Sequence, residues 1–343
     1  MIKEAIAILV SGNSLSKAEA ATVMEEIMER QATTAQLGAF LTALRIKGET
    51  AEEIAGLASV MRSKATTINI NEPLLDIVGT GGDGLNTFNI STTAAFVIAG
   101  AGVKVARHGN RAASSRCGSA DVLEALGVNI ELNAEQVKRC IEQAGIGFMF
   151  APIFHPAMKY VAAIRKEIGI RTVFNILGPL TNPAGARHLV IGVPSIELGD
   201  KIIAVFPHLD VRHALVVHGL NGMDELSISG RSVIWEIKDG KILRFRDRIS
   251  SKDAGLKTAP LKSVEGGTVK ENAQIMSAVL TGAKTPQRDV VLLNAAAALL
   301  AADKVDTLVE GVHLSAASID SGKAMVKLKQ LVEVSQSLKK KQG

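Results

Sequence analysis

The segment from residue 74 to residue 92 reads LLDIVGTGGDGLNTFNIST, and this segment decides the fold. Its apolar start at 74–78 is typical of a buried strand. The glycines from Gly79 to Gly84 allow a tight turn and let backbone N–H groups approach an anion closely. A helical pattern follows from Asn89, and we expect the Asn89 side chain to cap that helix. A strand, a glycine loop and a helix N-terminus in this order predict a phosphate-binding loop.

Strand and helix patterns alternate along much of the chain. Short apolar runs predict strands at 74–78, 103–106, 146–149, 189–193 and 214–217. Helical patterns lie between them at 91–99, 120–126, 134–144 and 196–206. This alternation predicts an α/β fold with a mostly parallel central sheet and helices on both faces.

Two later segments depart from this alternation. Residues 232–238 and 241–246 are separated by Asp239-Gly240 and predict a β-hairpin. The alanine- and leucine-rich segment 289–302 predicts a long helix near the end of the chain.

The first 65 residues are predicted to be helical throughout. Three capping boxes mark helix starts, and their residue pairs are Ser16 with Glu19, Thr33 with Gln36, and Thr50 with Glu53. Each box precedes an apolar stripe at helical spacing. Four short helices enclose little core by themselves, so these stripes need a partner, either the rest of the chain or a second copy.

The composition of the chain argues against several classes of protein. The 343 residues carry a net charge of +5, and about +2 remains without Lys339, Lys340 and Lys341. Aromatic residues make up only 3% of the chain, which argues against a surface that stacks on bases. The two cysteines are too few for a disulfide framework. Because the sequence shows neither a signal-peptide pattern nor a membrane-spanning run, we expect a cytoplasmic protein.

The glycine loop has two alternative interpretations. Gly79, Gly81 and Gly84 also form G-x-G-x-x-G, the pattern of dinucleotide-binding domains. In that motif the helix starts at once and an acidic residue follows roughly 20 residues later. Here the helix starts later and that region offers Arg107 and His108, which leaves NADP as the possible dinucleotide. The other alternative is a purely structural glycine turn.

Two more clusters follow predicted strands. Residues 107–119 read RHGNRAASSRCGS, in which Arg107 and Arg111, a histidine and three serines come after the strand at 103–106 and form a second candidate anion site. Two anion-binding loops on successive strands suit a ligand with phosphate groups at both ends. Asp224 and Glu225 follow the strand at 214–217, and such carboxylates suit Mg²⁺ shared with a diphosphate. We expect both carboxylates to be exposed.

These motifs together resemble the anthranilate phosphoribosyltransferase family. The matching segments are GTGGD at 79–83, NIST at 89–92, RHGNR at 107–111, GSADVLEALG at 118–127, HPAMKYVAAIRKEIGIRT at 155–172, FNILGPLTNPA at 174–184 and VVHGLNGMDEL at 216–226. Their order and spacing extend over nearly the whole chain, which makes the resemblance specific.

The resemblance implies an architecture and a reaction. It implies a helical domain at 1–68, joined by a returning segment near 155–185, and an α/β domain at 72–343. It further implies a homodimer, built in part by the apolar faces of the N-terminal helices. The implied reaction joins the amine of anthranilate to C1 of 5-phosphoribosyl 1-diphosphate and releases diphosphate, in tryptophan biosynthesis. Mg²⁺ is the implied cofactor, with two ions per active site.

The resemblance also implies a set of site residues. Those implied for 5-phosphoribosyl 1-diphosphate are Gly79, Gly82, Asp83, Thr87, Asn89, Ile90, Ser91, Thr92, Arg107, His108, Gly109, Asn110, Arg111, Ala112, Ala113, Ser114, Ser115 and Ser119. Those implied for anthranilate are Gly79, Asn110, Arg165, His108 and Pro179. The implied metal ligands are Ser91, Asp224 and Glu225.

This chain departs from the family pattern at one of these positions. The family usually has Lys where Arg107 stands, and a planar guanidinium does not replace a compact ammonium in every geometry. No residue is assigned as a general acid or base, because an aromatic amine is uncharged near neutral pH and already nucleophilic. Two related activities remain as alternatives. They are a pyrimidine nucleoside phosphorylase, whose lysine-serine loop is not evident here, and a nucleic-acid-binding relative, against which the intact GTGGD argues.

Overall fold

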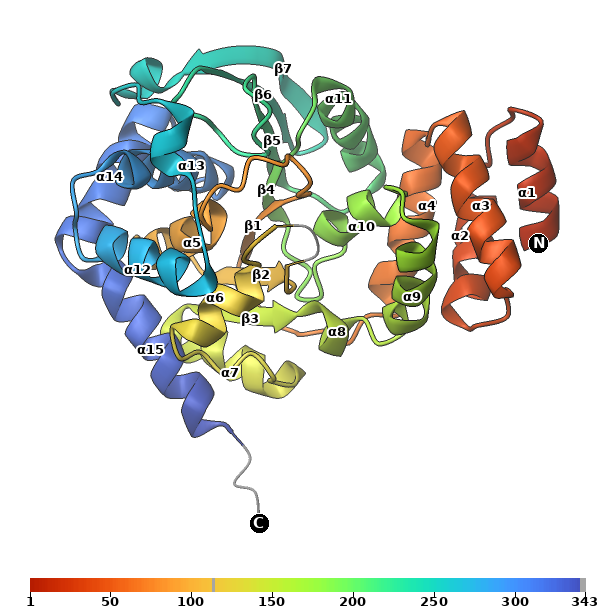
Figure 1. Ribbon diagram of the computed structural model, residues 1–343, viewed down its shortest axis with the longest axis horizontal. Coiled ribbons are helices and arrows are strands. Elements are labelled where there is room, and N and C mark those ends of the chain that lie inside the picture. The colour runs from red at the N-terminus through yellow and green to blue at the C-terminus, as the bar shows by residue number, and fades with distance from the viewer. Residues whose placement is uncertain (113–114, 340–343) are drawn as a thin grey trace.

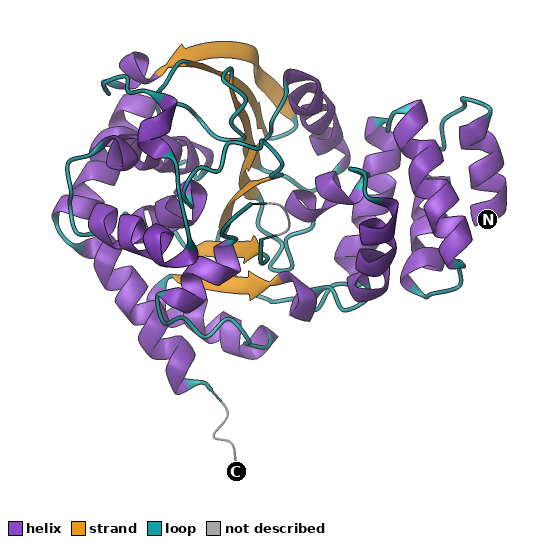
Figure 2. Cartoon of the chain, in the orientation of Figure 1, coloured by secondary structure: helices purple, strands orange, loops and turns teal. Residues whose placement is uncertain are grey.

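A computed structural model describes residues 1–112 and 115–339, and Figure 1 shows a bundle of N-terminal helices beside a larger region built around a sheet. Figure 2 shows the same division by secondary structure, with helices on both sides of the strands. The predicted fold class, helical plus α/β with a mostly parallel sheet, is confirmed.

The sheet has seven strands in the order β3-β2-β1-β4-β5-β6-β7. The five strands from β3 to β5 run parallel, and β6 and β7 are antiparallel to their neighbours. Every predicted strand and the hairpin are present, with these bounds: β1 (Leu75–Gly79), β2 (Val105–Gly109), β3 (Ile146–Phe150), β4 (His188–Gly192), β5 (His213–Gly219), β6 (Arg231–Lys238) and β7 (Lys241–Ser250).

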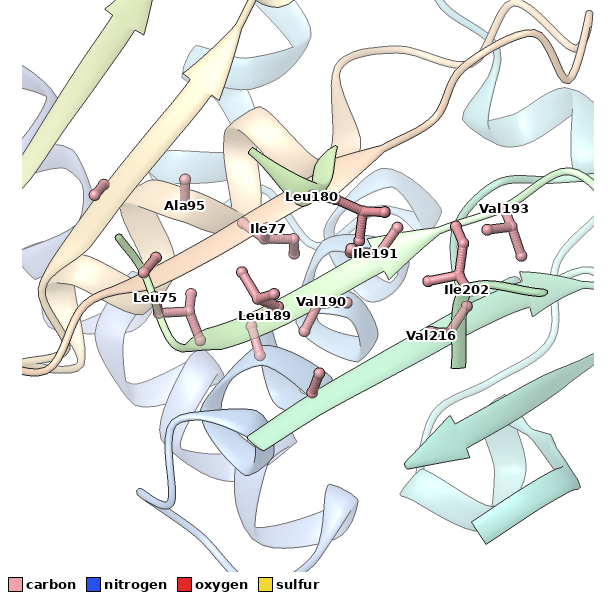
Figure 3. Packing of buried hydrophobic residues seen from close by; sticks show 14 of the residues in the cluster. Leu75, Ile77, Ala95, Leu180, Leu189, Val190, Ile191, Val193, Ile202 and Val216 are labelled. Atoms are coloured by element: carbon pink, nitrogen blue, oxygen red, sulfur yellow. The ribbon is translucent and has the colours of Figure 1, made fainter. Parts of the chain in front are cut away.

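Helices cover both faces of the sheet and bury its central strands. Figure 3 shows part of the resulting core, with Ile77, Val190 and Val216 contributed by three neighbouring strands. Strands buried on both faces need continuous apolar runs, which is why their sequences do not alternate. The helices of this region are α5 (Ile90–Gly100), α6 (Ser119–Ala125), α7 (Ala134–Ala144), α11 (Ile196–Val205), α12 (Val269–Leu280), α13 (Pro286–Ala301), α14 (Leu308–Asp320) and α15 (Lys323–Ser337).

The N-terminal bundle consists of α1 (Ile2–Val10), α2 (Lys17–Met28), α3 (Thr34–Lys47) and α4 (Ala51–Ser63). All three predicted capping boxes form at the starts of α2, α3 and α4. The Glu53 carboxylate also accepts from the Leu15 N–H at 2.9 Å and pairs with Lys47 at 2.9 Å, so one buried side chain joins three parts of the bundle.

A returning segment joins this bundle to the sheet. It contains α8 (Ala151–Phe154), α9 (Met158–Ile168) and α10 (Phe174–Leu180), and Figure 1 shows α9 and α10 beside the bundle. The Tyr160 hydroxyl donates to the Ala32 carbonyl at 3.0 Å, and the Arg62 side chain donates to the Leu180 carbonyl at 2.7 Å. The segment therefore attaches residues around 160–180 to the bundle.

The apolar stripes of the bundle are covered within the chain itself. Val23, Leu37 and Ile54 are each fully buried. Of the two partners left open for these stripes, the rest of the chain covers these three residues, because neighbouring helices and the returning segment pack on them. Val10 and Ile46 remain outside, with exposed fractions of 73% and 81%. In the part of the chain that the structure describes, no helix is long and apolar enough to cross a membrane.

Candidate active site

The segments after β1, β2 and β5 contain the predicted phosphate and metal residues, and parallel strands bring their carboxyl ends to one edge of the sheet (Figure 1). The glycine loop after β1 uses φ angles of +67° at Gly81, +79° at Gly82 and +72° at Gly84. Residues other than glycine rarely adopt such angles, so the loop path needs these glycines.

Hydrogen bonds from two directions fix the start of the glycine loop. The Thr80 N–H donates to the Gly192 carbonyl at 2.9 Å, and the Gly81 N–H donates to Asp224 Oδ2 at 2.7 Å. Further along, Thr87 pairs with Glu265 in an isolated antiparallel bridge. The loop is therefore held against β4, the segment after β5, and the segment before α12.

Asp224 and Glu225 are buried, with exposed fractions of 9% and 8%. The expectation that they are exposed is therefore wrong. The reason lies in the glycines opposite: a Cβ on Gly79 or on Gly192 would overlap Asp224, and these two glycines face each other in the β1–β4 register. The missing side chains let the Asp224 segment pack directly on the strand ends.

Burial makes these two carboxyl groups weaker acids than usual, because it raises the pKa of each. Burial and then repulsion from Asp83 raise the pKa of Asp224 from 3.8 to about 6. Burial followed by repulsion from Asp224 and Asp83 raises the pKa of Glu225 well above its ordinary value. Asp83 itself has one buried carboxylate oxygen with no hydrogen-bond partner among the described residues. Three acidic side chains thus share a region that lacks enough positive charge.

This acidic region fits Mg²⁺. Hard carboxylate oxygens are the ligands that Mg²⁺ prefers, and a divalent ion would relieve the repulsion that raises both pKa values. Within residues 1–112 and 115–339, no group of three or more His, Cys, Asp or Glu side chains converges on one metal position. The oxygens of a bound phosphate compound would have to complete the coordination.

The N-terminus of α5 lies against this acidic region. The Ser91 N–H donates to Glu225 Oε1 at 3.1 Å, so a carboxylate interacts with the positive end of the helix dipole. Asn89 stands at the N-cap position, but its side chain makes no capping hydrogen bond, and that expectation is wrong. Its amide instead donates to the Cys117 carbonyl at 3.2 Å and accepts from Asn272 at 3.1 Å. Ile90 is fully buried.

Arg107 lies inside β2 and not in a loop after it. Its guanidinium is buried and donates to the Ile77 carbonyl, to the Ser91 hydroxyl at 3.1 Å and to the Thr92 hydroxyl at 2.9 Å. Burial lowers the pKa of Arg107, and attraction to Asp76 and Glu225 opposes this shift. These partners explain why β2 extends to Gly109 and takes in a charged residue that the sequence places in a loop.

Acidic side chains of α6 hold the loop after β2 through ion pairs and hydrogen bonds. Arg111 is partly exposed and pairs with Asp121 at 3.0 Å and Glu124 at 2.8 Å. The Ala112 N–H donates to Asp121 at 2.9 Å, and the Ser119 hydroxyl donates to the Asn110 carbonyl at 3.3 Å. Ala113 and Ser114, two of the expected phosphate contacts, lie outside the described residues, and Ser115 follows them in the same loop.

Two buried histidines lie together between β2 and the returning segment. The ring centroids of His108 and His155 are 5.1 Å apart. Burial lowers the pKa of His108 from 6.5 to about 3 and that of His155 to about 4, so both rings are neutral near pH 7. The Nε2 atoms of both rings lack a hydrogen-bond partner among the described residues. Pro179, expected in the same region, is buried inside α10.

Arg165 projects from α9 and is half-buried. Its guanidinium lies 5.8 Å from the centroid of the Phe174 ring, and burial lowers its pKa. It forms no ion pair with an acidic side chain in the described part of the chain. A desolvated arginine without an acidic partner is suited to hold a carboxylate ligand.

Comparisons with known proteins agree with this geometry. Residues 71–325 match the α/β domain of a glycosyl transferase family, and residues 3–65 match the helical bundle domain of that family. The chain is 68% identical over 338 residues to a Dehalococcoides mccartyi protein named anthranilate phosphoribosyltransferase, covering 98% of this chain and 99% of that one.

This chain belongs to the anthranilate phosphoribosyltransferase family.

Solved structures of this family are similar throughout. Anthranilate phosphoribosyltransferase from Thermus thermophilus matches with a TM-score of 0.91 and 44% identity, covering 97% of this chain and 99% of that one. The Saccharomyces cerevisiae family member, solved in complex with PRPP and Mg, matches with a TM-score of 0.90 and 31% identity, covering 98% of each chain.

Several residues at this family site are not apparent from sequence reasoning. Asn182 donates to Asp76 at 2.7 Å and to the Ala106 carbonyl at 2.8 Å, and so links the end of the returning segment to β1 and β2. Asn272, from α12, holds Asn89. Arg171 donates to two carbonyls of the glycine loop. The local sequence gives no signal for these roles beyond a polar residue at the end of an apolar segment.

Proposed function

We propose that the carboxyl edge of β1, β2 and β5 binds 5-phosphoribosyl 1-diphosphate and that the neighbouring returning segment binds anthranilate. The enzyme transfers the phosphoribosyl group to the amine of anthranilate, giving N-(5-phosphoribosyl)anthranilate and diphosphate in tryptophan biosynthesis. The observation that carries the site assignment is the hydrogen bond between Gly81 and Asp224, because it joins the phosphate loop to the acidic region.

Backbone N–H groups and cations bind the phosphates in this proposal. The contacts come from the glycine loop, the start of α5 and the loop after β2, and the residues are Gly79, Gly82, Asp83, Thr87, Asn89, Ile90, Ser91, Thr92, Arg107 to Ala112, Ser115 and Ser119. Backbone N–H groups at a glycine loop and a helix N-terminus are suited to diphosphate. The buried Arg107 acts indirectly, through its hydrogen bonds to the Ser91 and Thr92 hydroxyls.

Mg²⁺ is used by the family, as the yeast complex illustrates. When bound, the ion neutralises charge on the departing diphosphate. We assign two ions to each site, held by Ser91, Asp224 and Glu225. The chain's own contribution is to keep both carboxylates close to the glycine loop, where the leaving group would lie.

Anthranilate is bound by a different set of residues, which are Gly79, Asn110, Arg165, His108 and Pro179. The Arg165 guanidinium holds the carboxylate, while the neutral His108 ring and Pro179 shape the approach to the site. Arg165 is half-buried and Pro179 is buried. No strong base is required, because the aromatic amine reacts in its uncharged form.

The remaining parts of the proposal concern the whole protein. We assign 1–68 with the segment near 155–185 to one domain and 72–343 to the other, in agreement with the separate family matches. We also propose a cytoplasmic homodimer. The exposed apolar side chains Val10 and Ile46 support a contact with a second copy through the bundle.

Loss of anthranilate fluorescence tests the reaction directly. The purified protein is mixed with anthranilate, 5-phosphoribosyl 1-diphosphate and Mg²⁺, and each component is omitted in turn. Fluorescence should fall only in the complete mixture. Phosphorolysis of a pyrimidine nucleoside, assayed in parallel, should not occur. A fluorescence trace that stays flat in the complete mixture would contradict the proposed function.

A further inference from the structure

Arg171 connects the returning segment to the glycine loop. It lies between α9 and α10, and its Nη1 atom donates to the Gly81 carbonyl at 3.1 Å and to the Gly82 carbonyl at 3.2 Å. Both carbonyls belong to the loop between β1 and α5, about 90 residues away in sequence. One cation therefore binds two successive peptide groups of the phosphate loop.

Peptide geometry gives this contact a consequence. In a planar trans peptide, the C=O and the N–H point in opposite directions. The Gly81 carbonyl shares its peptide plane with the Gly82 N–H, and the Gly82 carbonyl shares its plane with the Asp83 N–H. Binding both carbonyls turns these two N–H groups away from Arg171. Neither N–H has an acceptor among the described residues, so both are available to an anion.

The Arg171 guanidinium packs closely on Gly82 but is not enclosed on all sides. A Cβ on Gly82 would overlap the Arg171 guanidinium, so only glycine permits this approach. On another side, Arg171 borders a cavity of about 310 Å³ that is also lined by Thr172, Ser195 and Lys201. The side chain thus has room to leave the loop, and the two hydrogen bonds to the carbonyls keep it there.

We propose that Arg171 is a positioning residue that presets the Gly82 and Asp83 N–H groups for the diphosphate of 5-phosphoribosyl 1-diphosphate. This inference rests on the proposed function. It also links the two substrate sites, because Arg171 follows the helix that carries Arg165 and ends on the loop that receives the other substrate. A preset loop binds its ligand without the entropy cost of ordering it.

Two variants and a matched control test the proposal. Arg171→Met keeps the length of the side chain but removes the donors, and Arg171→Lys keeps the charge with a different geometry. Lys166→Met removes an exposed cation from the same segment and serves as the control. The readouts are calorimetric binding of 5-phosphoribosyl 1-diphosphate with Mg²⁺ in the absence of anthranilate, the KM for each substrate, and amide exchange of residues 79–85 in ligand-free protein.

We expect Arg171→Met to weaken the binding of the diphosphate substrate, raising both its Kd and its KM about 10- to 50-fold, the scale of one or two hydrogen bonds to a charged group. The anthranilate KM should change less than about 2-fold. Amide exchange should accelerate at Gly81, whose N–H bond to Asp224 depends on the loop path. Arg171→Lys should recover part of the affinity, and Lys166→Met should match the parent.

Three results would overturn the proposal. Unchanged affinity and unchanged exchange would mean that the contact positions nothing. An increase confined to the anthranilate KM would assign Arg171 to the other substrate. Faster exchange with unaltered affinity would make the contact structural only. Should Arg171→Met fail to fold, Arg171→Lys decides by the same readouts. A parent protein that binds no 5-phosphoribosyl 1-diphosphate would instead refute the proposed function, while the exchange data would still test the hydrogen bonds.

Discussion

Asp224 accepts a 2.7 Å hydrogen bond from the N–H of Gly81, and this bond joins the acidic segment after β5 to the glycine loop after β1. The two residues are 143 positions apart in sequence. Asp224 also sits on Gly79 and Gly192, so the sheet edge itself holds the carboxylate in place. A change at Asp224 should therefore affect the metal and the phosphate loop together.

The first prediction is that Asp224→Asn weakens the binding of Mg²⁺ without lowering the stability of the metal-free protein. The amide can still accept from Gly81, and it removes a buried charge that Asp83 and Glu225 repel. Without metal, the melting temperature should equal or exceed that of the parent. Mg²⁺ with 5-phosphoribosyl 1-diphosphate should raise the melting temperature of the parent much more than that of the variant. Activity should fall about 10²- to 10³-fold.

Asp210→Asn is the control for this experiment, because Asp210 is exposed and pairs with Arg187, and both residues precede the strands β4 and β5 whose opposite ends lie at the acidic region. It should keep both the ligand-induced stabilisation and the activity. An Asp224→Asn variant with the parental Mg²⁺ titration curve would contradict the metal assignment.

The second prediction concerns pH. Burial holds the pKa of His108 at about 3 and that of His155 at about 4, below the 6.5 of an unfolded histidine. Between these values the unfolded state binds more protons, so these two histidines cost stability as the pH falls below 6.5. Neither ring should show its NMR titration midpoint above pH 5. A midpoint near 6.5 for either ring would mean that it is exposed or paired.

Much of the fold could be predicted because its signals are local. Apolar runs and helical periodicity depend on neighbouring residues, and so do the Ser16, Thr33 and Thr50 capping boxes. The hairpin around Asp239-Gly240 is equally local: Asp239 and Gly240 both have positive φ angles, as a tight hairpin turn requires.

The interior of the site could not be predicted in this way. From the sequence Arg107 is interpreted as a loop cation, because its partners Ser91 and Thr92 lie on another segment that only the folded chain brings to it. Asp224 reads as a surface residue until two glycines on separate strands are aligned opposite it. Arg171 has no local pattern, because its partners are carbonyl groups that every residue has. The hydrophobic periodicity of a segment does not show which of its polar residues will be buried by segments far away in the sequence.

The third prediction compares two glycines of the phosphate loop. Gly82 and Gly84 have similar φ angles of +79° and +72°, so alanine should strain both alike. Only at Gly82 would the added Cβ overlap Arg171, whereas Gly84 has open space. Gly82→Ala should therefore raise the KM for the diphosphate substrate at least about 10-fold more than Gly84→Ala does. Equal effects in steady-state kinetics would show that backbone strain alone is responsible.

The fourth prediction is that Arg107 is needed for stability. Arg107→Met would remove the cation that attracts the buried Asp76 and Glu225, and it would remove the side-chain donor to the Ile77 carbonyl. Breaking such a buried network should cost about 3–5 kcal/mol, seen as a large fall in the melting temperature. Arg107→Lys should recover part of this loss.

Arg187→Met is the matched control for Arg107, because the Arg187 ion pair with Asp210 is exposed and should contribute less than about 1 kcal/mol. Equal melting temperatures for Arg107→Met and the parent would mean that the Arg107 guanidinium is not the countercharge of the buried carboxylates.

The last prediction tests the second substrate through Arg165. Anthranilate carries a carboxylate beside its amine, and a guanidinium can hold it with two parallel hydrogen bonds. Arg165 is half-buried over Phe174, so its contact with a carboxylate would be partly shielded from water. Losing that contact in Arg165→Ala should cost about 2–3 kcal/mol, or roughly 30- to 150-fold in kcat/KM for anthranilate.

The pattern of the Arg165→Ala loss matters more than its size. Steady-state kinetics with each substrate varied separately should show a higher anthranilate KM and little change for the diphosphate substrate. Lys166→Ala changes the next residue on α9, which is exposed, and this variant should behave like the parent. If only the diphosphate substrate suffers, Arg165 faces the other site. If neither KM changes, the Arg165 guanidinium serves to pack on Phe174, and another cation must hold the carboxylate.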